Sequence, residues 1–310
     1  MSILVTGGTG LVGHAIKNIS DKYPYKFVFI GSKDCDLTNL EATRDLFKSI
    51  RPKYVIHLAA NVGGVFKNIH CKVEMYEKNI LINHHVIKVS HEFSVEKVVS
   101  CLSTCIFPDK TTYPINESML HDGPPHISND AYAYSKRMLE VQSRAYQQQY
   151  GDRFICVIPT NIYGPHDNFS LEDAHVIPAL IHRCYLNKRD NEDFVVRGSG
   201  SPLRQFIFST DLAKLMMWVL EDYDELDSII LSDILENEIT IKKISELIAE
   251  EYNYSDHIIY DTTYTDGQYK KTADNSKLIG LIGNFKFTPI KDGIRKSVLW
   301  FNKNIDTCRK

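Results

Sequence analysis

The sequence lacks the features that mark membrane proteins, secreted proteins and nucleic-acid binders. No apolar run approaches the roughly 18 residues that a membrane-spanning helix needs, and the first ten residues hold no lysine or arginine, unlike a secretory signal. The formal net charge is −3 at pH 7, so bulk electrostatics gives no reason for a nucleic acid or an anionic membrane to bind. We therefore expect neither partner.

The chain also lacks paired cysteines. Its 7 cysteines are odd in number and scattered through 310 residues, with no Cys-x-x-Cys spacing. Disulfide frameworks and zinc ribbons need cysteine pairs, usually at short spacings. We therefore expect reduced thiols, no metal ion and a reducing compartment, the cytoplasm.

What the chain does have is a regular alternation of short apolar runs with helix-length stretches such as Leu40–Ile50 and Met75–Phe93. Apolar residues make up 43% of the sequence, enough for a sizeable core. Strands that alternate with helices predict an α/β fold with a Rossmann-like, doubly wound parallel sheet. The expected strands are Met1–Val5, Phe27–Ile30, Tyr54–Ala60, Lys97–Leu102 and Phe154–Pro159.

This alternation breaks after Gly164. The next forty residues are rich in loops, with one helix candidate at Val176–Leu186, and Phe206–Phe208 then predicts a return to the sheet. The C-terminal part mixes a helix, a strand at His257–Tyr260 and polar loops. The expected domains are a Rossmann cofactor-binding domain of residues 1–164 and 206–233, and a smaller substrate-binding lobe of residues 165–205 and 234–310.

A glycine-rich turn follows the first strand and opens a helix. Gly7, Gly10 and Gly13 form Gly-x-x-Gly-x-x-Gly. The first glycine permits the tight turn, the second lets the backbone approach a pyrophosphate, and the third lets helix and strand pack closely. The spacing resembles that of the short-chain dehydrogenase/reductase superfamily. The expected dinucleotide contacts are Gly7, Gly8, Thr9, Gly10, Leu11, Val12 and Gly13.

The residues after the second strand distinguish the two nicotinamide cofactors. A carboxylate there binds the ribose 2′-hydroxyl of NAD, whereas a cation accepts the 2′-phosphate of NADP. Ser32 and Lys33 favour NADP, although Asp34 follows them. Asp36 and Leu37 resemble the superfamily's adenine contact, in which the carboxylate accepts a hydrogen bond from the exocyclic amine.

A tyrosine and a lysine stand four residues apart at the start of a helical stretch. That spacing places Tyr132 and Lys136 on one helix face. A phenol has an unperturbed pKa of about 10, and a neighbouring ammonium lowers it toward useful proton transfer. The same lysine can hydrogen-bond the nicotinamide ribose. Taken alone, Tyr-x-x-x-Lys is common by chance.

Three further residues could act on a carbonyl group. Ser103 follows the fourth strand, so its hydroxyl can donate a hydrogen bond to a carbonyl oxygen at the carboxyl edge of the sheet. Cys105 lies two residues further on, and His175 precedes the helix of the second lobe. A thiol and an imidazole can exchange protons beside a ketone as base and acid, although a lone cysteine is more often a buried apolar residue.

Four stretches resemble the GDP-L-fucose synthase family. The run Pro-Thr-Asn-Ile-Tyr-Gly-Pro-His-Asp-Asn is highly specific, and Cys101–Pro114 looks closer to animal-type than to bacterial-type members. The resemblance spans most of the chain. The stretches are Ser103–Pro108, Pro159–Asn168, His175–Leu180 and Asp266–Lys271.

The resemblance implies a three-step reaction at one site. GDP-4-keto-6-deoxy-D-mannose would be epimerised at C3 and C5, with Cys105 as base and His175 as acid. NADPH would then reduce C4. Tyr132 would supply the proton for this step, Lys136 would tune it, and Ser103 would orient the ketone.

The family's binding residues carry over by position. Arginine suits the diphosphate of a GDP-sugar because it binds phosphate bidentately. Bacterial members have a tryptophan where this chain has Arg197, so that contact is a departure from the family pattern. For the cofactor the resemblance implies Lys136, Pro159, Asn161, Ile162 and His175. For the substrate it implies Asn161, Arg183, Arg197, Arg204, Asp266 and Lys271.

The resemblance also implies a homodimer, with Met75–Phe93 and Tyr134–Tyr150 as candidate interface helices. Two alternatives stay open. One is another nucleotide-sugar epimerase, reductase or dehydratase, although Thr104 and Cys105 stand where dehydratases have Asp-Glu. The other is a non-catalytic NADP-binding regulator, a class that often loses the tyrosine or the lysine.

Overall fold

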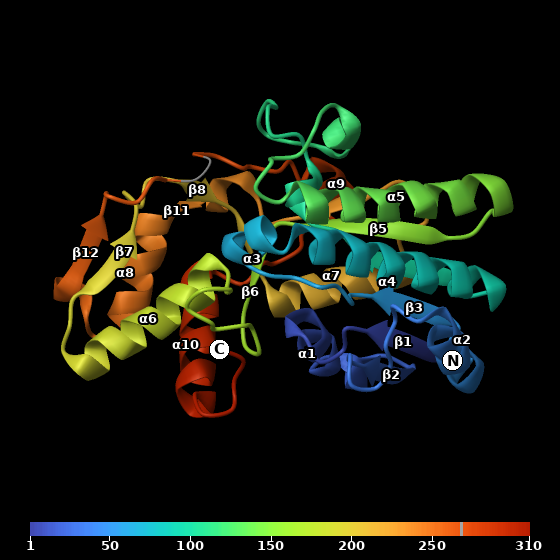
Figure 1. Ribbon diagram of the computed structural model, residues 1–310, viewed down its shortest axis with the longest axis horizontal. Helices are drawn as coiled ribbons and strands as arrows, with labels where there is room; N and C mark the ends of the chain where they lie inside the picture. The colour runs from blue at the N-terminus through green and yellow to red at the C-terminus, as the bar shows by residue number, and fades with distance from the viewer. Residues whose placement is uncertain (267–268) are drawn as a thin grey trace. The chain divides into compact units, whose positions relative to one another are not determined.

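The structure is a computed structural model that describes residues 1–266 and 269–310. It contains two compact units, each discontinuous in sequence (Figure 1). Across the described ranges, no helix is both long enough and apolar enough to cross a membrane. Unit one comprises Met1–Lys110, Glu117–Pro159 and Thr210–Leu231, and unit two comprises Thr111–Asn116, Thr160–Ser209 and Ser232–Lys310.

Unit one is built on a six-stranded sheet with the order β10-β5-β4-β3-β1-β2. Every neighbouring pair of strands is parallel, and β4 and β5 are buried along their whole length, as expected for strands covered on both faces. The predicted doubly wound α/β fold is confirmed. The strands are β1 (Ser2–Thr6), β2 (Lys26–Ile30), β3 (Tyr54–His57), β4 (Lys97–Cys101), β5 (Phe154–Pro159) and β10 (Ile229–Leu231).

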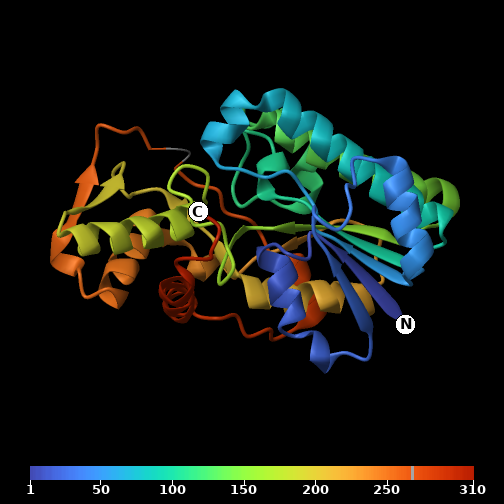
Figure 2. The same ribbon diagram turned by 60° about the horizontal axis from the view of Figure 1, so that its bottom comes forward.

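Helices cover both faces of this sheet. Figure 2 shows α4 and α5 on one face and α1 and α7 on the other, and α4 and α5 are in extensive contact. At the start of α2 the Asn39 side chain accepts a hydrogen bond from Ala42 N (3.0 Å), and α5 ends at Gly151 with φ 77°. The helices are α1 (Leu11–Lys17), α2 (Leu40–Ile50), α3 (Val65–His70), α4 (Lys72–Glu92), α5 (Asp130–Tyr150) and α7 (Ser209–Glu221), with short 3-10 turns η1 (Ser20–Lys22), η2 (Thr104–Ile106) and η3 (Glu117–His121).

Unit two has three small strand pairs and a separate apolar core. β6 pairs with β9 and β7 with β12 in parallel, whereas β8 and β11 are antiparallel. Helices α6, α8 and α10 contact one another around large side chains that include Phe169, Phe194 and Phe301. The elements are β6 (Asn161–Tyr163), α6 (Val176–Asp190), β7 (Phe194–Arg197), β8 (Leu203–Arg204), β9 (Phe206–Phe208), η4 (Leu235–Asn237), β11 (Ile239–Thr240), α8 (Ile241–Glu251), η5 (Ser255–His257), β12 (Ile258–Asp261), α9 (Ser276–Ile282) and α10 (Ile290–Asn304).

The prediction that Phe206–Phe208 rejoins the main sheet is wrong. This strand is β9, and it pairs with β6, where Phe206 and Phe208 pack edge-on against Tyr163 with ring centroids 6.0 and 5.5 Å apart. Tyr163 is also seated closely against α10, since a Cβ on Gly293 would lie 2.0 Å from its hydroxyl. After β6, the chain therefore returns to the sheet through α7 and β10.

The units also divide at different positions from the expected domains. The sequence suggested boundaries after residues 164, 205 and 233, whereas the units divide after Pro159, Ser209 and Leu231. Unit two includes an early segment, in which Ile115 forms a β-bridge to Ala273. After residue 234 it contains α8, α9 and α10, which is more helix than the sequence suggested.

Candidate functional site

The turn between β1 and α1 has no room for side chains at two glycines. Gly7 has φ +68°, and a Cβ there would lie 2.7 Å from the backbone nitrogen of Ala59. A Cβ on Gly13 would lie 2.5 Å from the backbone of Gly8. Gly10 is the N-cap of α1 and accepts a hydrogen bond from His14 N at 2.9 Å. Only glycines at these positions keep the turn closed, as a dinucleotide-binding turn requires.

The residues after β2 present a cation and a hydroxyl to solvent. Ser32, Lys33 and Asp34 are all exposed, and the Asp34 carboxylate also accepts a hydrogen bond from Gly31 N at 2.8 Å. That bond ties Asp34 to its own turn and leaves Lys33 as the group better placed for a phosphate. Asp34, the residue whose charge disfavours NADP, is therefore less available to repel the 2′-phosphate.

Asp36, the expected adenine contact, is also ordered by its neighbours. Its Oδ1 accepts hydrogen bonds from Thr38 N (2.9 Å) and Thr38 Oγ1 (2.7 Å), and these bonds lower the pKa of the carboxyl. Its Oδ2 is not part of either bond. Leu37 beside it is buried.

The catalytic-type tyrosine and lysine lie on the first turns of α5. Lys136 is buried, and its Nζ donates a hydrogen bond to Cys101 O at 2.8 Å and lies 6.0 Å from the centre of the Tyr132 ring. Desolvation lowers the pKa of Lys136. Desolvation also raises the pKa of Tyr132, and thiolate charge at Cys105 or Cys101 would raise it further.

The direction for Tyr132 is therefore opposite to the expected one. We expected the lysine to lower the pKa of the phenol, but removal of the ring from water raises it. Such a tyrosine stays protonated at neutral pH, which suits a proton donor rather than a base.

Ser103 and Cys105 lie directly beyond β4, in the same unit as Tyr132 and Lys136. Ser103 is the N-cap of η2, and its Oγ accepts a hydrogen bond from Cys105 N at 3.5 Å. The half-buried Cys105 sits within η2, which the Arg137 guanidinium anchors to α5 by donating to Ile106 O at 2.5 Å. Unit one thus gathers a hydroxyl, a thiol, a phenol and an ammonium at the carboxyl end of β4.

The remaining expected residues of the nicotinamide side are spread over both units. Pro159 is the last residue of β5, whereas Asn161 opens β6 in unit two, where its Nδ2 donates to Gln205 O at 2.8 Å. Ile162 follows in β6 and is half-buried. His175 is the N-cap residue of α6, with φ −68° and ψ 167°. Its side chain reaches solvent, yet desolvation by the surrounding residues lowers its pKa.

Unit two brings arginines close to one another. Desolvation, and secondly the charge of Arg197, lower the pKa of Arg183. Arg197 lies over the ring of Tyr264, with its Cζ 4.8 Å from the ring centre. The guanidinium of Arg204 is partly desolvated too, which lowers its pKa. The proximity of Arg183 and Arg197 favours a doubly charged anion such as a diphosphate.

Asp266 is already engaged by a nearby turn. Its Oδ1 accepts a hydrogen bond from Ser199 N (2.9 Å), and its Oδ2 accepts one from Ser199 Oγ (2.6 Å). Gly198, with φ +90°, has no space for a Cβ beside this carboxylate. Lys271 is half-buried in the same unit. The two residues at 267 and 268, inside the motif that contains both, lie outside the described residues.

The sequence did not single out the asparagines that order the loop after β3. The Asn79 side chain accepts a hydrogen bond from Asn61 N and donates one to Asn61 O, both at 2.9 Å. It is fully buried. The available signal was the pair of amides, Asn79 and Asn83, four residues apart and therefore on one face of the helix. Within residues 1–266 and 269–310, no cluster of three or more His, Cys, Asp or Glu side chains could hold a metal ion.

Residues 3–231 match the model of the NAD dependent epimerase/dehydratase family. The chain belongs to this family. Within the epimerase/dehydratase family, its similarity to one group extends along the whole chain. The GDP-L-fucose synthase of Dictyostelium discoideum is 53% identical over 312 residues, covering 100% of this chain and 98% of that protein. The probable GDP-L-fucose synthase of Drosophila melanogaster is 48% identical over 318 residues, 99% of each chain.

A solved epimerase/dehydratase structure agrees with this. The crystal structure of a GDP-L-fucose synthetase from Naegleria fowleri bound to NADP has a TM-score of 0.96 and 46% sequence identity, covering 100% of this chain and 95% of that one. The resemblance to the GDP-L-fucose synthases that the motifs suggested is confirmed.

The glycine turn makes a first prediction. In Gly13→Ala the new methyl group would meet the backbone of Gly8, so we expect a loss of about 1–3 kcal/mol of stability and at least about tenfold weaker NADPH binding, measured by thermal unfolding and nicotinamide fluorescence. Gly280→Ala is the control, because a Cβ there meets nothing within 4 Å and α9 should gain helix propensity. Unchanged NADPH affinity in Gly13→Ala would contradict the role of the turn.

Proposed function

We propose that the protein converts GDP-4-keto-6-deoxy-D-mannose to GDP-L-fucose, by epimerisation at C3 and C5 and NADPH-dependent reduction at C4. The observation that carries this proposal is the thiol of Cys105 at η2, in the unit that also holds the reductase pair Tyr132 and Lys136. A reductase needs the pair but not the thiol. The full-length similarity to GDP-L-fucose synthases supports the same substrate.

The residues of unit one fit NADP. The closed glycine turn accommodates a pyrophosphate, Ser32 and Lys33 are exposed for the 2′-phosphate, and Asp34 is tied to Gly31. When bound, NADPH supplies the hydride for C4 of the sugar. We propose Pro159, Asn161, Ile162, Lys136 and His175 for the nicotinamide half, as the family resemblance implies; Asn161 also counts among the proposed substrate contacts.

Epimerisation needs a base and an acid beside the ketone. The 4-keto group makes the hydrogens on C3 and C5 acidic, so Cys105 as thiolate removes a proton and the electron pair moves to the carbonyl oxygen. His175 returns a proton to the opposite face of the carbon, which inverts it. Ser103 stabilises the oxyanion by donating its hydroxyl hydrogen.

Reduction needs a proton donor at the oxygen on C4. Tyr132 donates its proton to that oxygen as the hydride arrives, and its raised pKa keeps the phenol protonated until then. An alkoxide is more basic than a phenolate, so the transfer runs downhill. Lys136, held by Cys101 O, stabilises the phenolate that remains.

The proposed substrate contacts of unit two divide into two roles. Arg183, Arg197, Arg204 and Lys271 supply positive charge for the diphosphate. Arg197 replaces the bacterial tryptophan, and its stacking on Tyr264 keeps a flat surface there. Asp266 acts by holding the turn at Ser199.

The alternatives fit less well. A 4,6-dehydratase would need an acid and a base where this chain has Thr104 and Cys105, and a simple 4-epimerase has no use for the thiol and His175. A non-catalytic regulator has no need to keep Tyr132 and Lys136 on one helix with Lys136 hydrogen-bonded to the strand end.

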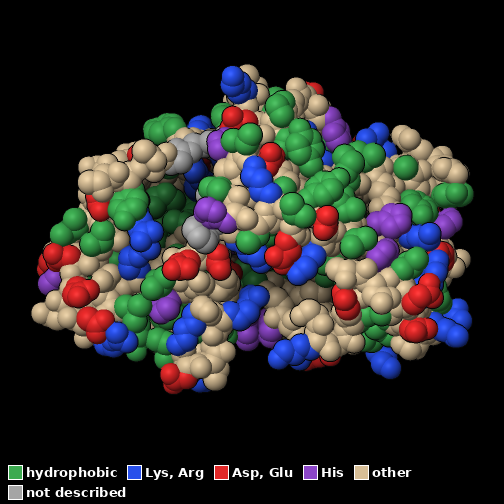
Figure 3. Space-filling view, in the orientation of Figure 1, with side chains coloured by type: hydrophobic (Ala, Val, Ile, Leu, Met, Phe, Trp, Pro, Cys, Tyr) green, Lys and Arg blue, Asp and Glu red, His purple; other side chains and the backbone are tan. Residues whose placement is uncertain are grey.

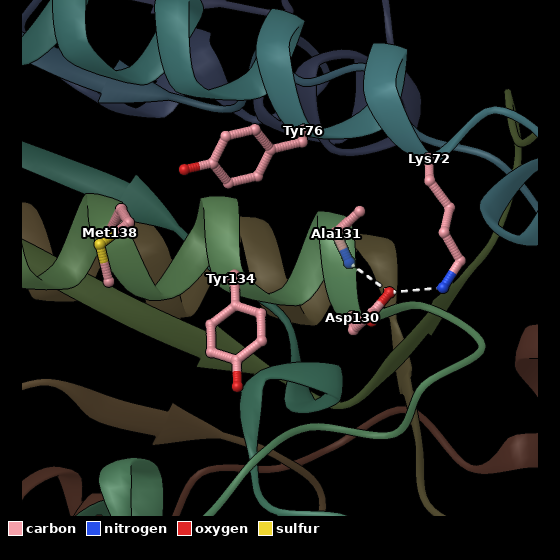
Figure 4. Close-up of a pocket in the computed structure, with 6 residues that line it drawn as sticks. All are labelled: Lys72, Tyr76, Asp130, Ala131, Tyr134 and Met138. Carbon is pink, nitrogen blue, oxygen red and sulfur yellow. Dashed lines mark hydrogen bonds and ion pairs between the residues drawn. The ribbon is translucent and has the colours of Figure 1, made fainter.

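We also propose a cytoplasmic homodimer that forms through the outer face of α4 and α5. Tyr76, Tyr134 and Met138 are each at least 40% exposed. With Lys72, Asp130 and Ala131 they line a hollow of about 400 Å³ (Figure 4), and Figure 3 shows apolar side chains gathered over these helices. An exposed apolar patch of this kind favours association. None of the 7 cysteines forms a disulfide within the described chain, which suits a reducing compartment.

The reaction is tested with GDP-4-keto-6-deoxy-D-mannose, NADPH and deuterated water. We expect GDP-L-fucose carrying deuterium at C3 and C5. In Cys105→Ser deuterium incorporation should fall by about 10²–10⁴-fold, because the hydroxyl is a far weaker base. Cys308→Ser is the control, a half-buried thiol of unit two whose Sγ donates to Ile305 O at 3.6 Å. NADPH that binds but is not consumed by the wild type would refute the substrate.

The raised pKa of Tyr132 predicts the pH dependence of reduction. The protonated phenol is the active form, so it is present below its raised pKa and lost only above that value. We expect the single-turnover rate of C4 reduction to show no Tyr132-dependent decline between about pH 6 and about pH 10, and Tyr132→Phe to be about 10²–10⁴-fold slower throughout. A decline centred near neutral pH that disappears in Tyr132→Phe would show instead that Lys136 lowers this pKa.

The dimer is tested with two separate variants, one that places a charge on α5 at the proposed interface and one that places a charge on α10 as a control. In Met138→Glu the carboxylates of the two subunits would be buried at the interface and would repel each other. We therefore expect a monomer by light scattering at micromolar concentration. Leu299→Glu is the control, since Leu299 is 60% exposed on α10 in unit two and should leave the dimer intact. A monomeric wild type would refute the proposal.

A further inference from the structure

A row of buried polar side chains crosses unit one beneath the glycine turn. Thr6 comes from β1, His57 from β3, Asn83 from α4 and Ser135 from α5. None is more than 2% exposed. Burying four polar residues in an apolar interior costs free energy unless their donors and acceptors are hydrogen-bonded.

The four residues form one continuous hydrogen-bond chain. Thr6 Oγ1 lies 2.7 Å from His57 Nδ1, and His57 Nε2 lies 3.1 Å from Asn83 Oδ1. Asn83 Nδ2 donates to Ser135 O at 3.4 Å. At the other end, Ala59 N donates to Thr6 Oγ1 at 3.3 Å.

Only one assignment of protons satisfies every member. Asn83 Nδ2 faces a carbonyl, so Oδ1 faces His57, whose Nε2 must carry the hydrogen. Nδ1 is then an acceptor and takes the hydroxyl hydrogen of Thr6, whose oxygen remains free to accept from Ala59 N. The imidazole stays neutral, because burial and the charge of Lys136 lower its pKa to about 3.

The two ends of the chain touch the two halves of the reductase site. Thr6 is the last residue of β1, directly before Gly7 of the dinucleotide turn. Ser135 directly precedes Lys136, and its Oγ donates to Tyr132 O at 2.7 Å. The chain therefore connects the cofactor turn with the helix turn that carries the tyrosine and the lysine.

We propose that Thr6, His57 and Asn83 are positioning residues, which set the place of the Tyr132–Lys136 turn relative to the dinucleotide turn. β1 and β3 are already fixed by ladder hydrogen bonds such as Leu58 N to Thr6 O at 3.1 Å, whereas helices packed on a sheet have no such bonds. A slide of α4 or α5 would leave buried donors and acceptors unpaired, which opposes the slide. The proposal rests only on the NADP-binding part of the function proposed above.

The experiment is a double-mutant cycle read by NADPH binding, without any sugar. Thr6→Val and Asn83→Leu should each weaken NADPH binding about tenfold. The double variant should be about tenfold weaker as well, rather than about a hundredfold, because either change breaks the same chain. Thr6→Ser keeps the hydroxyl and should restore wild-type affinity. If Asn83→Leu does not fold, Asn83→Asp keeps nearly the same shape and breaks the same link, because it replaces the Nδ2 donor with a carboxyl oxygen that faces Ser135 O.

Thr43→Val is the matched control. Thr43 is also fully buried and its Oγ1 donates to Asn39 O at 2.8 Å, but it lies in α2 outside the chain. It should lower thermal stability without changing NADPH affinity. Multiplicative losses in the double variant, or a similar affinity loss in Thr43→Val, would overturn the proposal. A wild type that binds NADPH but leaves the keto sugar unchanged would refute the proposed reaction and leave this inference standing.

Discussion

The close approach of two backbone segments, the turn after β1 and the end of β3, is the constraint on which unit one depends. A side chain at Gly7 would collide with Ala59, and one at Gly13 would collide with Gly8. The parallel ladder places Thr6 beside His57, and the glycines let the turn that follows Thr6 close against the chain after β3. The same tightness leaves the open edge of the turn as peptide backbone, the surface that a pyrophosphate can approach.

The polar residues of unit one fall into two groups, a buried set and the reactive side chains. A neutral histidine and two asparagines fill the polar interior. Lys136 is held by a strand-end carbonyl, and Ser103 caps the turn that carries Cys105. The Lys136 ammonium and the Ser103 hydroxyl are thus each fixed by a backbone partner rather than by another reactive side chain. Such fixing keeps acid, base and oxyanion donor distinct while a single carbonyl group passes through several steps.

Much of the fold and of the candidate site could be predicted from the sequence. The features that could not be predicted depend on contacts between distant residues or on burial, which local patterns do not show. Alternating strands and helices, the glycine spacing and the Tyr132–Lys136 pair are local patterns, and the fold they predict was found. The pairing of β9 with β6 joins segments far apart in the sequence, and the Asp266–Ser199 bonds join residues 67 positions apart. The pKa of Tyr132 was expected to move the wrong way, because spacing reveals a neighbouring charge but not the loss of water around a ring.

The interleaving of the two units has a consequence for how the protein is made. Neither unit is a continuous stretch of chain, and the edge strand of the sheet, β10, ends at Leu231. During synthesis the glycine turn and the catalytic helix emerge long before that strand, while parts of unit two emerge between them. The sheet therefore cannot be completed until β10 has been synthesised, and one edge of β5 stays unpaired in the nascent chain until then. Substitutions that make the edge of β5 more prone to aggregate would therefore act during synthesis, before the final packing can protect it.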